Sequence, residues 1–204
     1  MRTNEELVKE LLQMGIAAPE VAAAMLKYPR ELFLPLEEIQ NAYYDLPVPI
    51  GEGQTCSAPS MVATMLSLLG LKKGHTVLEI GTGCAWQTAL ISELVGKEGR
   101  VVSIDKIKKF SDCAKDLLDK LNIKNIELIN ADGKNGYDKH APYDRIIVSA
   151  ACDKVYPAWE KQLRDGGIII LPMGDMFQWL FKGIKKNGNI ELMRLMPVQF
   201  VKLS

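Results

Sequence analysis

The stretch from residue 76 to 90, T-V-L-E-I-G-T-G-C-A-W-Q-T-A-L, decides the fold of this chain. It begins with an apolar run, residues 76–80, that one acid, Glu79, interrupts. A Gly81-Thr82-Gly83 turn follows, and apolar residues then recur at helical spacing over residues 85–94. The stretch therefore predicts a buried strand, a glycine turn and a helix, the opening unit of a nucleotide-binding α/β site.

The residues after the turn discriminate between ligands. A dinucleotide fingerprint, G-x-G-x-x-G, would place its third glycine at the position of Trp86. A P-loop would need Gly-Lys-Ser or Gly-Lys-Thr after the turn, and the chain has neither there. The remaining pattern is E-x-G-x-G-like, with Ala85 in place of a last glycine, and it resembles the first motif of S-adenosylmethionine-dependent methyltransferases. The alternative is a turn that only connects a strand to a helix.

Acidic residues follow two further predicted strands. The strand over residues 101–104 ends in Asp105, 24 residues after Gly81, where this architecture accepts hydrogen bonds from ribose hydroxyls. The strand over residues 126–129 leads to Asp132 and Gly133, which could hold an adenine edge. Each acid alone also fits a solvated loop or a helix cap. Together with the glycine turn, they predict one cofactor site at the ends of three successive strands.

Composition limits the other partners. The 204 residues are 48% apolar and 25% charged, which is ordinary for a globular protein. The 25 basic and 25 acidic residues balance, so we expect no nucleic-acid partner. No apolar run approaches the ~20 residues of a membrane span, and the N-terminal residues do not have the form of a signal peptide. We therefore expect no membrane association, a cytoplasmic location and a monomer.

Cysteines and histidines argue against metal or acid–base chemistry. The four cysteines form no C-x-x-C pair and have no companion histidine cluster, which predicts reduced thiols and no metal site. The two histidines, His75 and His140, lie in polar, turn-like contexts and suit no general base. We therefore expect a reaction that requires none.

We expect a single methyltransferase domain over residues 1–204, divided into a cap with an active-site loop, 1–60, and a cofactor-binding core, 61–204. Thr3 and Glu6 form a capping-box pattern before a first helix, and Pro19 begins a second. Residues 41–59 form a long, polar, glycine-rich loop, which is typical of a functional segment. Its Ser57 alternatively caps the helix that begins at Pro59.

The second half of the chain alternates strands and helices. Asp165-Gly166-Gly167 is predicted to end a helix, and residues 168–171 to form a strand that Pro172 stops. Asn187-Gly188 then joins two antiparallel strands, the second over residues 190–203. The alternation predicts an α/β fold class, a doubly wound, mostly parallel sheet with an antiparallel C-terminal hairpin and an N-terminal helical cap. The resemblance of the glycine turn implies that this sheet is of the Rossmann-like methyltransferase type.

Over nearly its whole length the sequence resembles the protein-L-isoaspartate O-methyltransferase family. Six motifs outside the glycine turn carry the resemblance: M-L-K-Y-P-R-E-L-F-L-P (25–35), A-Y-Y-D-L-P-V-P-I-G (42–51), G-Q-T-C-S-A-P (53–59), A-D-G-K-N-G-Y (131–137), A-P-Y-D-R-I-I-V (141–148) and K-Q-L-R-D-G-G (161–167). The Q-T-x-S loop and the P-R-E-x-F segment are the most specific of these.

The resemblance implies methyl transfer from S-adenosyl-L-methionine to the free carboxylate of L-isoaspartyl residues in damaged proteins or peptides. The ester then closes to a succinimide that can reopen to aspartate. By matching motif positions, Ser57 is the expected catalytic residue and Gln54, Thr55 and Cys56 bind substrate. The expected cofactor-binding residues are Glu79, Gly81, Thr82, Gly83, Asp105, Lys106, Asp132 and Gly133. A carboxylate with a pKa near ~4 is already ionised at neutral pH, which agrees with the shortage of histidines.

Three departures from the family pattern keep other functions open. Gly83-Cys84-Ala85-Trp86 stands where the family has Gly-Ser-Gly-Tyr, and Phe200-Val201-Lys202-Leu203 where it has F-V-P-L. Cys56 stands where a β-branched residue is common. The alternatives are a methyltransferase for another carboxylate or a small molecule, and a non-catalytic paralogue that binds S-adenosylmethionine. An NAD oxidoreductase is disfavoured by Trp86.

Overall fold

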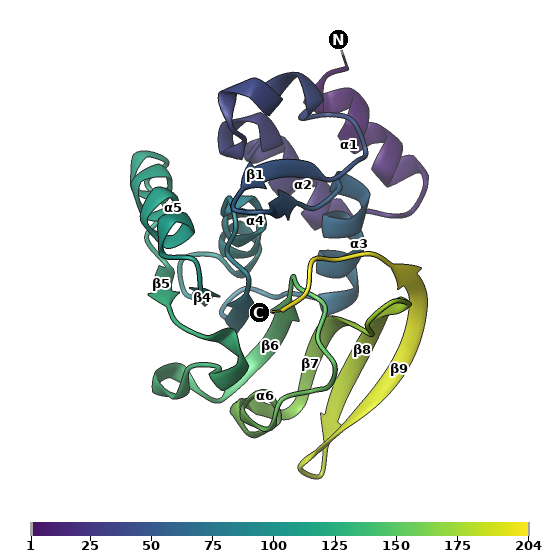
Figure 1. Ribbon diagram of the computed structural model, residues 1–204, viewed down its shortest axis with the longest axis vertical. Helices are drawn as coiled ribbons and strands as arrows, with labels where there is room; N and C mark the ends of the chain where they lie inside the picture. Colours follow the sequence, from purple (N-terminus) through teal and green to yellow (C-terminus); the bar gives the residue numbers. More distant parts are fainter. Residues whose placement is uncertain (1, 204) are drawn as a thin grey trace.

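A seven-stranded sheet forms the centre of the molecule in the computed structural model, which describes residues 2–203 (Figure 1). Its order is β5-β4-β3-β6-β7-β8-β9. The strands from β5 to β7 pair in parallel, and β8 and β9 are antiparallel. Their bounds are Thr76–Ile80 (β3), Arg100–Asp105 (β4), Ile126–Asn130 (β5), Tyr143–Val148 (β6), Leu163–Met173 (β7), Gln178–Lys186 (β8) and Asn189–Val198 (β9). The predicted fold class is confirmed.

The chain winds outward from β3 in two directions. β4 and β5 lie on one side of β3, and β6 and β7 on the other. In such sheets the order of strands reverses at the starting strand, and the crevice outside the carboxyl ends of the strands there is the usual ligand site. The topology therefore predicts a ligand site at the end of β3, where the glycine turn begins.

Alternate residues along the strands supply two apolar layers. Val77 belongs to the layer that also holds α3 (Pro59–Leu69), α4 (Trp86–Val95) and α5 (Lys108–Lys120). Leu78, the next residue, faces the opposite layer with Trp159 of α6 (Pro157–Gln162). Because a strand points successive side chains to opposite faces, one apolar run serves both layers.

The N-terminal helices pack on the same core as the sheet. α1 (Asn4–Gln13) begins with the predicted capping box, in which the Glu6 N–H donates to Thr3 Oγ1 at 3.2 Å. α2 (Pro19–Lys27) begins at the predicted proline. Val21 and Met25 of α2 lie in one cluster with residues of α4 and the sheet. This shared core supports the proposal that residues 1–60 belong to a single domain with the remainder.

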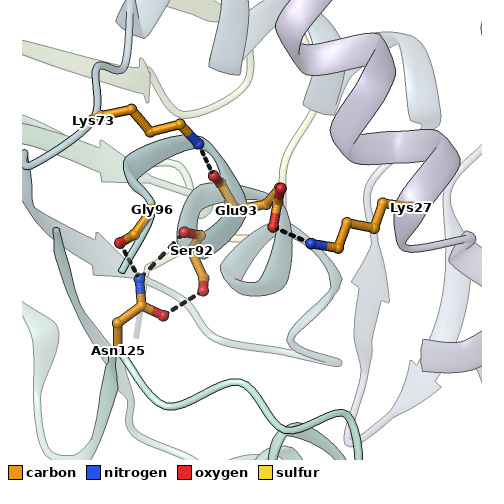
Figure 2. A network of polar contacts seen from close by, with 6 residues as sticks. All are labelled: Lys27, Lys73, Ser92, Glu93, Gly96 and Asn125. Carbon is orange, nitrogen blue, oxygen red and sulfur yellow. Dashed lines mark hydrogen bonds and ion pairs between the residues drawn. The ribbon is translucent and has the colours of Figure 1, made fainter. Parts of the chain in front are cut away.

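Polar contacts join α4 to its surroundings (Figure 2). Lys27 Nζ of α2 lies 2.7 Å from a carboxylate oxygen of Glu93, and Lys73 Nζ donates to the Glu93 carbonyl at 2.6 Å. At the end of the helix, Asn125 Nδ2 donates to the carbonyls of Ser92 and Gly96 at 3.2 and 2.8 Å. Residues of α2 and of the loops that precede β3 and β5 therefore fix the position of α4, the helix that follows the glycine turn.

The loop predicted over residues 41–59 contains a short hairpin. β1 (Val48–Gly51) pairs with β2 (Gln54–Cys56) through a turn in which Glu52 and Gly53 both have positive φ. Two 3-10 helices, η1 (Arg30–Phe33) and η2 (Leu36–Asn41), precede it. The alternation of polarity over strands this short is too brief to recognise in the sequence.

Three predicted boundaries in the second half are wrong. β7 already begins at Leu163, before the Asp165-Gly166-Gly167 segment, which a shift of register accommodates inside the strand. Pro172 does not stop β7, because it pairs with Leu180 across an antiparallel ladder while its carbonyl accepts from Cys152 N. β9 ends at Val198, and the chain after it turns back across the strand ends (Figure 1).

Candidate active site

A main cleft opens at the carboxyl ends of β3 and β4, below the β1–β2 hairpin. It encloses about 890 Å³, counting the space at its mouth. Ten of the twelve predicted site residues line it, namely Gln54, Thr55, Cys56, Ser57, Gly81, Thr82, Gly83, Asp105, Lys106 and Gly133. Glu79 and Asp132 do not. The strand ends thus bring six of these residues together as predicted, and the segment of β2 supplies the other four, residues 54–57.

The glycine turn takes a left-handed backbone at three positions. Gly81, Gly83 and Ala85 have φ values of 97°, 50° and 66°. Glycine adopts such values without a Cβ penalty, so the main chain at Gly81 and Gly83 is open to a ligand. Ala85 is fully buried at the start of α4 and carries the strain of a left-handed alanine, about 1–2 kcal/mol.

Asp105 at the end of β4 fixes the turn from the side. Its Oδ2 accepts from the Gly83 N–H at 2.9 Å, and its Oδ1 accepts from the Ile107 N–H at 2.9 Å. A carboxylate has about four acceptor positions, so both oxygens retain capacity for a further donor in the cleft. Asp105 therefore suits the predicted role toward ribose hydroxyls.

Glu79 lies beneath the turn and is fully buried. Its carboxylate accepts from Gln87 Nε2 at 2.9 Å, Thr88 Oγ1 at 2.5 Å and Ser103 Oγ at 2.7 Å. Burial raises the pKa of Glu79 to about 7, against the effect of these hydrogen bonds. Glu79 therefore does not line the main cleft, and contact between Glu79 and the cofactor stays a prediction.

Two of these hydrogen-bonded neighbours connect Glu79 to the cleft wall by further hydrogen bonds. Ser103 Oγ is 2.7 Å from Thr82 Oγ1 in the glycine turn. Gln87 Nε2 also donates to Ser149 Oγ, at 2.8 Å, just after β6. Glu79 is therefore a positioning residue for side chains from β3, β4 and β6.

Asp132 is occupied by its own turn. Its carboxylate accepts from the Lys134 N–H at 3.0 Å and caps the 3-10 helix η3 (Gly133–Asn135). Gly133 lines the cleft and packs on Ile80 so closely that a Cβ could not fit. The Gly133 position is therefore restricted to glycine, while contact between Asp132 and adenine stays a prediction.

A buried arginine holds the loop that carries the serine. Arg30 is fully buried. Its guanidinium carbon lies over the ring of Trp86, 5.5 Å from the ring centroid. Its guanidinium donates to four main-chain carbonyls, those of Ala42 (3.2 Å), Leu46 (3.1 Å), Cys56 (3.0 Å) and Ser57 (3.0 Å). The sequence marks Arg30 only as part of the P-R-E-x-F segment, so its role in the site was missed.

Ser57 does not cap the following helix. Ala58 is the N-cap of α3, and Asp45 Oδ1 accepts from the Ser60 N–H at 2.8 Å in the first turn. The capping alternative is therefore wrong.

Ser57 borders a second hollow next to the main cleft. The hollow measures about 510 Å³, counting the open space at its mouth. It is lined by Pro47, Thr55, Ser57, Ala58, Met61, Ser149, Gln199, Phe200 and Val201. Four residues line both spaces, namely Thr55, Ser57, Ser149 and Val201. The predicted catalytic loop thus stands between two adjoining spaces.

Sequence reasoning missed part of the wall. Ser149 follows β6 at the same sheet edge as Gly81 and could have been found by extending the strand-end argument to a fourth strand. Val201 and Leu203 come from the segment after β9, which no local pattern directs to the cleft. Lys202, noted as a departure from the family, lines the cleft and forms an ion pair with Asp175.

The described residues contain neither a group of metal-ligand side chains nor a membrane-spanning helix. Within residues 2–203 no three His, Cys, Asp or Glu side chains gather as metal ligands. No helix in that range has the length and apolarity to cross a bilayer.

The fold and the site together define the class of protein. A glycine turn after the first parallel strand of the switch point, with an acid at the end of the next strand and no third fingerprint glycine, is the arrangement of an S-adenosylmethionine-dependent methyltransferase. Within that class, the family model described as protein-L-isoaspartate(D-aspartate) O-methyltransferase matches residues 1–204. The chain belongs to this family.

Individual relatives agree over the full length. A protein-L-isoaspartate O-methyltransferase of Ignicoccus hospitalis is 45% identical over 203 residues, which cover 98% of this chain and 96% of the relative. A solved protein-L-isoaspartate O-methyltransferase structure superposes with a TM-score of 0.91 at 32% identity, covering 99% of this chain. This chain spans only 66% of that larger one.

A second similar structure was solved with a bound ligand. It is a protein from Plasmodium falciparum, named as a protein-L-isoaspartate O-methyltransferase by assignment, in complex with S-adenosyl-L-homocysteine. It superposes with a TM-score of 0.89 at 25% identity and covers 100% of this chain and 99% of its own.

Proposed function

We propose that this chain transfers a methyl group from S-adenosyl-L-methionine to the free carboxylate of L-isoaspartyl residues in damaged proteins or peptides, which begins their repair through a succinimide. Family membership supports the reaction. The single structural observation that carries the proposal is the shared wall between the main cleft and the second hollow, where Ser57 and Thr55 lie. A donor in the cleft and an acceptor in the hollow would meet at that wall.

The main cleft fits the cofactor. Gly81 and Gly83 offer main chain without a side chain in the way, and Asp105 offers carboxylate oxygens for ribose hydroxyls. Ile107 and Phe110 add apolar surface to the same cleft. When bound, the cofactor supplies an electrophilic methyl group on a cationic sulfonium.

The second hollow suits the substrate. We infer that an isoaspartyl peptide enters it and directs its carboxylate to Ser57 and Thr55, whose hydroxyls donate hydrogen bonds to the carboxylate. These bonds orient the nucleophile without removing a proton, because a carboxyl group with a pKa near ~4 is already ionised. Neither His75 nor His140 lines either space, which agrees with a reaction without a general base.

The protein then contributes alignment and exclusion of water. Arg30 fixes the carbonyl of Ser57, and the Glu79 network fixes Thr82 and Ser149 on the opposite side. Holding two reactants in line converts an intermolecular displacement into an effectively intramolecular one. Since both spaces are walled by one chain, we infer that a monomer suffices, and a cytoplasmic location remains a prediction from the sequence.

The test is methyl incorporation into an isoaspartyl peptide and into its normal aspartyl twin. We expect incorporation into the isoaspartyl peptide alone. Equal incorporation into both would favour a less selective carboxylate methyltransferase. Incorporation into neither, with S-adenosylhomocysteine still binding, would favour a non-catalytic paralogue.

The role of Ser57 is tested separately with Ser57→Ala. Turnover at saturating peptide is expected to fall, while cofactor binding is retained. Ser60→Ala is the matched control, because Ser60 lies three residues further along and lines neither space. Full turnover of Ser57→Ala at saturating peptide would remove Ser57 from the mechanism.

A further inference from the structure

The cleft residue Gly133 is held by a tryptophan that does not itself line the cleft. Trp159 of α6 is fully buried, and its indole Nε1 donates to the Gly133 carbonyl at 2.8 Å. The Gly136 N–H donates to the same carbonyl at 3.0 Å. A carbonyl oxygen has two acceptor positions, and these two donors occupy them. The orientation of the Gly133 carbonyl is therefore fixed by the protein itself.

Gly133 also contacts the sheet closely. Ile80 of β3 packs where a Cβ of Gly133 would lie, and Ile80 belongs to the same apolar layer as Trp159. Both Gly133 and Ile80 line the main cleft, whereas Trp159 lines neither the cleft nor the second hollow. A movement of Gly133 away from Trp159 would therefore change the wall of the main cleft.

Gln162, three residues after Trp159 in α6, holds the residues that follow Gly133. The Gln162 side chain is buried, and its Oε1 accepts from the Tyr137 N–H at 2.8 Å. Its Nε2 donates to the Asn135 carbonyl at 3.1 Å and to Asp138 Oδ1 at 2.9 Å. Residues three apart in a helix lie on the same side of it. One side of α6 therefore holds the whole segment that follows β5.

The place of Gly133 along the sheet edge indicates which part of the cofactor it faces. The strand order there is β5-β4-β3-β6. Asp105 ends β4, Gly133 follows β5, and Ser149 follows β6 in the wall shared with the second hollow. With the ribose at Asp105 and the methyl group directed at the shared wall, the base of the adenosyl group would be directed toward β5 and Gly133.

We propose that Trp159 is a positioning residue of the cofactor site, whose indole N–H holds Gly133 in place for the adenosyl half of S-adenosylmethionine. The contact acts on the methyl donor and not on the acceptor, because Gly133 lines the main cleft but not the second hollow. Without the indole donor, one acceptor position of the Gly133 carbonyl is unfilled and the peptide can shift. This inference rests on the proposed function for the placement of the cofactor, but not for the identity of the acceptor.

The experiment measures ligand binding to the full chain and to Trp159→Phe, which keeps an aromatic ring and removes the donor. The ligands are S-adenosylhomocysteine and 5′-methylthioadenosine, which has the adenosyl part without the amino acid. We expect both Kd values, measured by calorimetry, to rise by about 3- to 10-fold, the equivalent of one neutral hydrogen bond. Trp179→Phe is the matched control, because Trp179 lies on β8 and lines neither space.

The indole N–H resonances give a second readout, which a merely structural role of Trp159 would not move. The chain has three tryptophans, and the two phenylalanine variants assign the resonances of Trp159 and Trp179. S-adenosylhomocysteine should shift the Trp159 resonance in the wild-type chain and leave that of Trp179 in place. Circular dichroism shows whether each variant folds. If Trp159→Phe does not fold, Gln162→Met replaces it, and its Kd values should rise in the same direction.

Unchanged Kd values in folded Trp159→Phe, or in Gln162→Met where it replaces that variant, would overturn the proposal. So would an equal rise in Trp179→Phe, or a Trp159 resonance that S-adenosylhomocysteine does not move. Weaker binding of S-adenosylhomocysteine alone would also overturn it, since the effect would then concern the amino-acid half. None of these measurements requires methyl transfer, so a chain that binds as expected but methylates no isoaspartyl peptide would overturn only the proposed function.

Discussion

The guanidinium of Arg30 donates a hydrogen bond to the carbonyl oxygen of Ser57 at 3.0 Å. A side chain of the N-terminal cap thereby holds the main chain of the residue expected to orient the substrate. A buried cation is tolerated only where its donors are satisfied, and here main-chain carbonyls and the face of Trp86 satisfy them. The N-terminal cap therefore helps to hold the wall of the candidate active site.

Arg30→Met should destabilise the fold and reduce turnover together. The substitution leaves several buried carbonyls without donors, each at about 1–3 kcal/mol, so we expect the free energy of unfolding to fall by at least ~3 kcal/mol. Urea denaturation measures the loss. Lys27→Met is the control, because Lys27 forms an exposed pair with Glu93 that contributes about 1 kcal/mol at most. Equal losses in both variants would contradict the role of Arg30.

Asp105→Asn should weaken cofactor binding. The amide offers a neutral acceptor to ribose and loses one of the oxygens that fix Gly83 and Ile107, and hydrogen bonds to charged groups are worth about 1.5–3 kcal/mol. We expect the Kd for S-adenosylhomocysteine, measured by calorimetry, to rise by about 10- to 100-fold. Asp112→Asn, on the exposed face of α5, should leave it unchanged. If both variants bind alike, Asp105 is not a cofactor ligand.

Glu79→Gln should change how stability depends on pH. The pKa of Glu79 is raised from its ordinary 4.5 to about 7, so between these values the folded chain holds a proton that the unfolded chain releases. Stability of the wild type therefore carries a contribution that falls as pH rises from 4.5 to 7 and then levels off. The variant lacks this contribution, and its stability relative to the wild type should be higher at pH 8 than at pH 5 by urea denaturation.

Glu127→Gln is the comparison for Glu79→Gln, because the pKa of Glu127 is lowered in the folded chain and not raised. Neighbouring Lys139 and His140 lower the pKa of Glu127 to about 2, so its contribution is present above 4.5 and is lost as pH falls toward 2. Between pH 5 and pH 8 this contribution is constant. If Glu79→Gln and Glu127→Gln behaved alike over that range, the buried protonated Glu79 would be excluded.

Ala85→Gly should cost less stability than Ala89→Gly in the same helix. Both alanines are buried, but Ala85 has a φ of 66° while Ala89 lies in the interior of α4. Removing the methyl group relieves the left-handed strain only at Ala85, so the two losses should differ by about 1–2 kcal/mol. Thermal unfolding of the two variants checks this difference. Equal losses would mean that Ala85 is unstrained.

Strongly periodic segments made much of the fold predictable. The apolar run before Gly81 and the strand ending at Asp105 were placed correctly because period and flanking turn residues agree there. The β1–β2 hairpin was missed, since its strands have only four and three residues and the first of them contains proline and glycine. Pro172 was misread because its pairing partner lies in a later strand.

The site was predictable where strand ends dictate proximity. Six of the predicted residues border the main cleft because they follow parallel strands that end at one edge. The other four, residues 54–57, reach the cleft from the β1–β2 hairpin and were predicted from the family resemblance. Whether a side chain points into the cleft or beneath it depends on packing, and so the depth of Glu79 was not visible in the sequence. The position of Val201 in the cleft wall could not be predicted either, since no local sequence pattern indicates it.

The cleft takes wall residues from positions as far apart as Ile50 and Leu203. During translation, a nascent chain that has emerged only as far as β7 still lacks one side of this wall. We therefore expect the binding wall to be completed only after Val201 has been synthesised, and a ribosome-stalled fragment ending before Val201 to retain the donor less well.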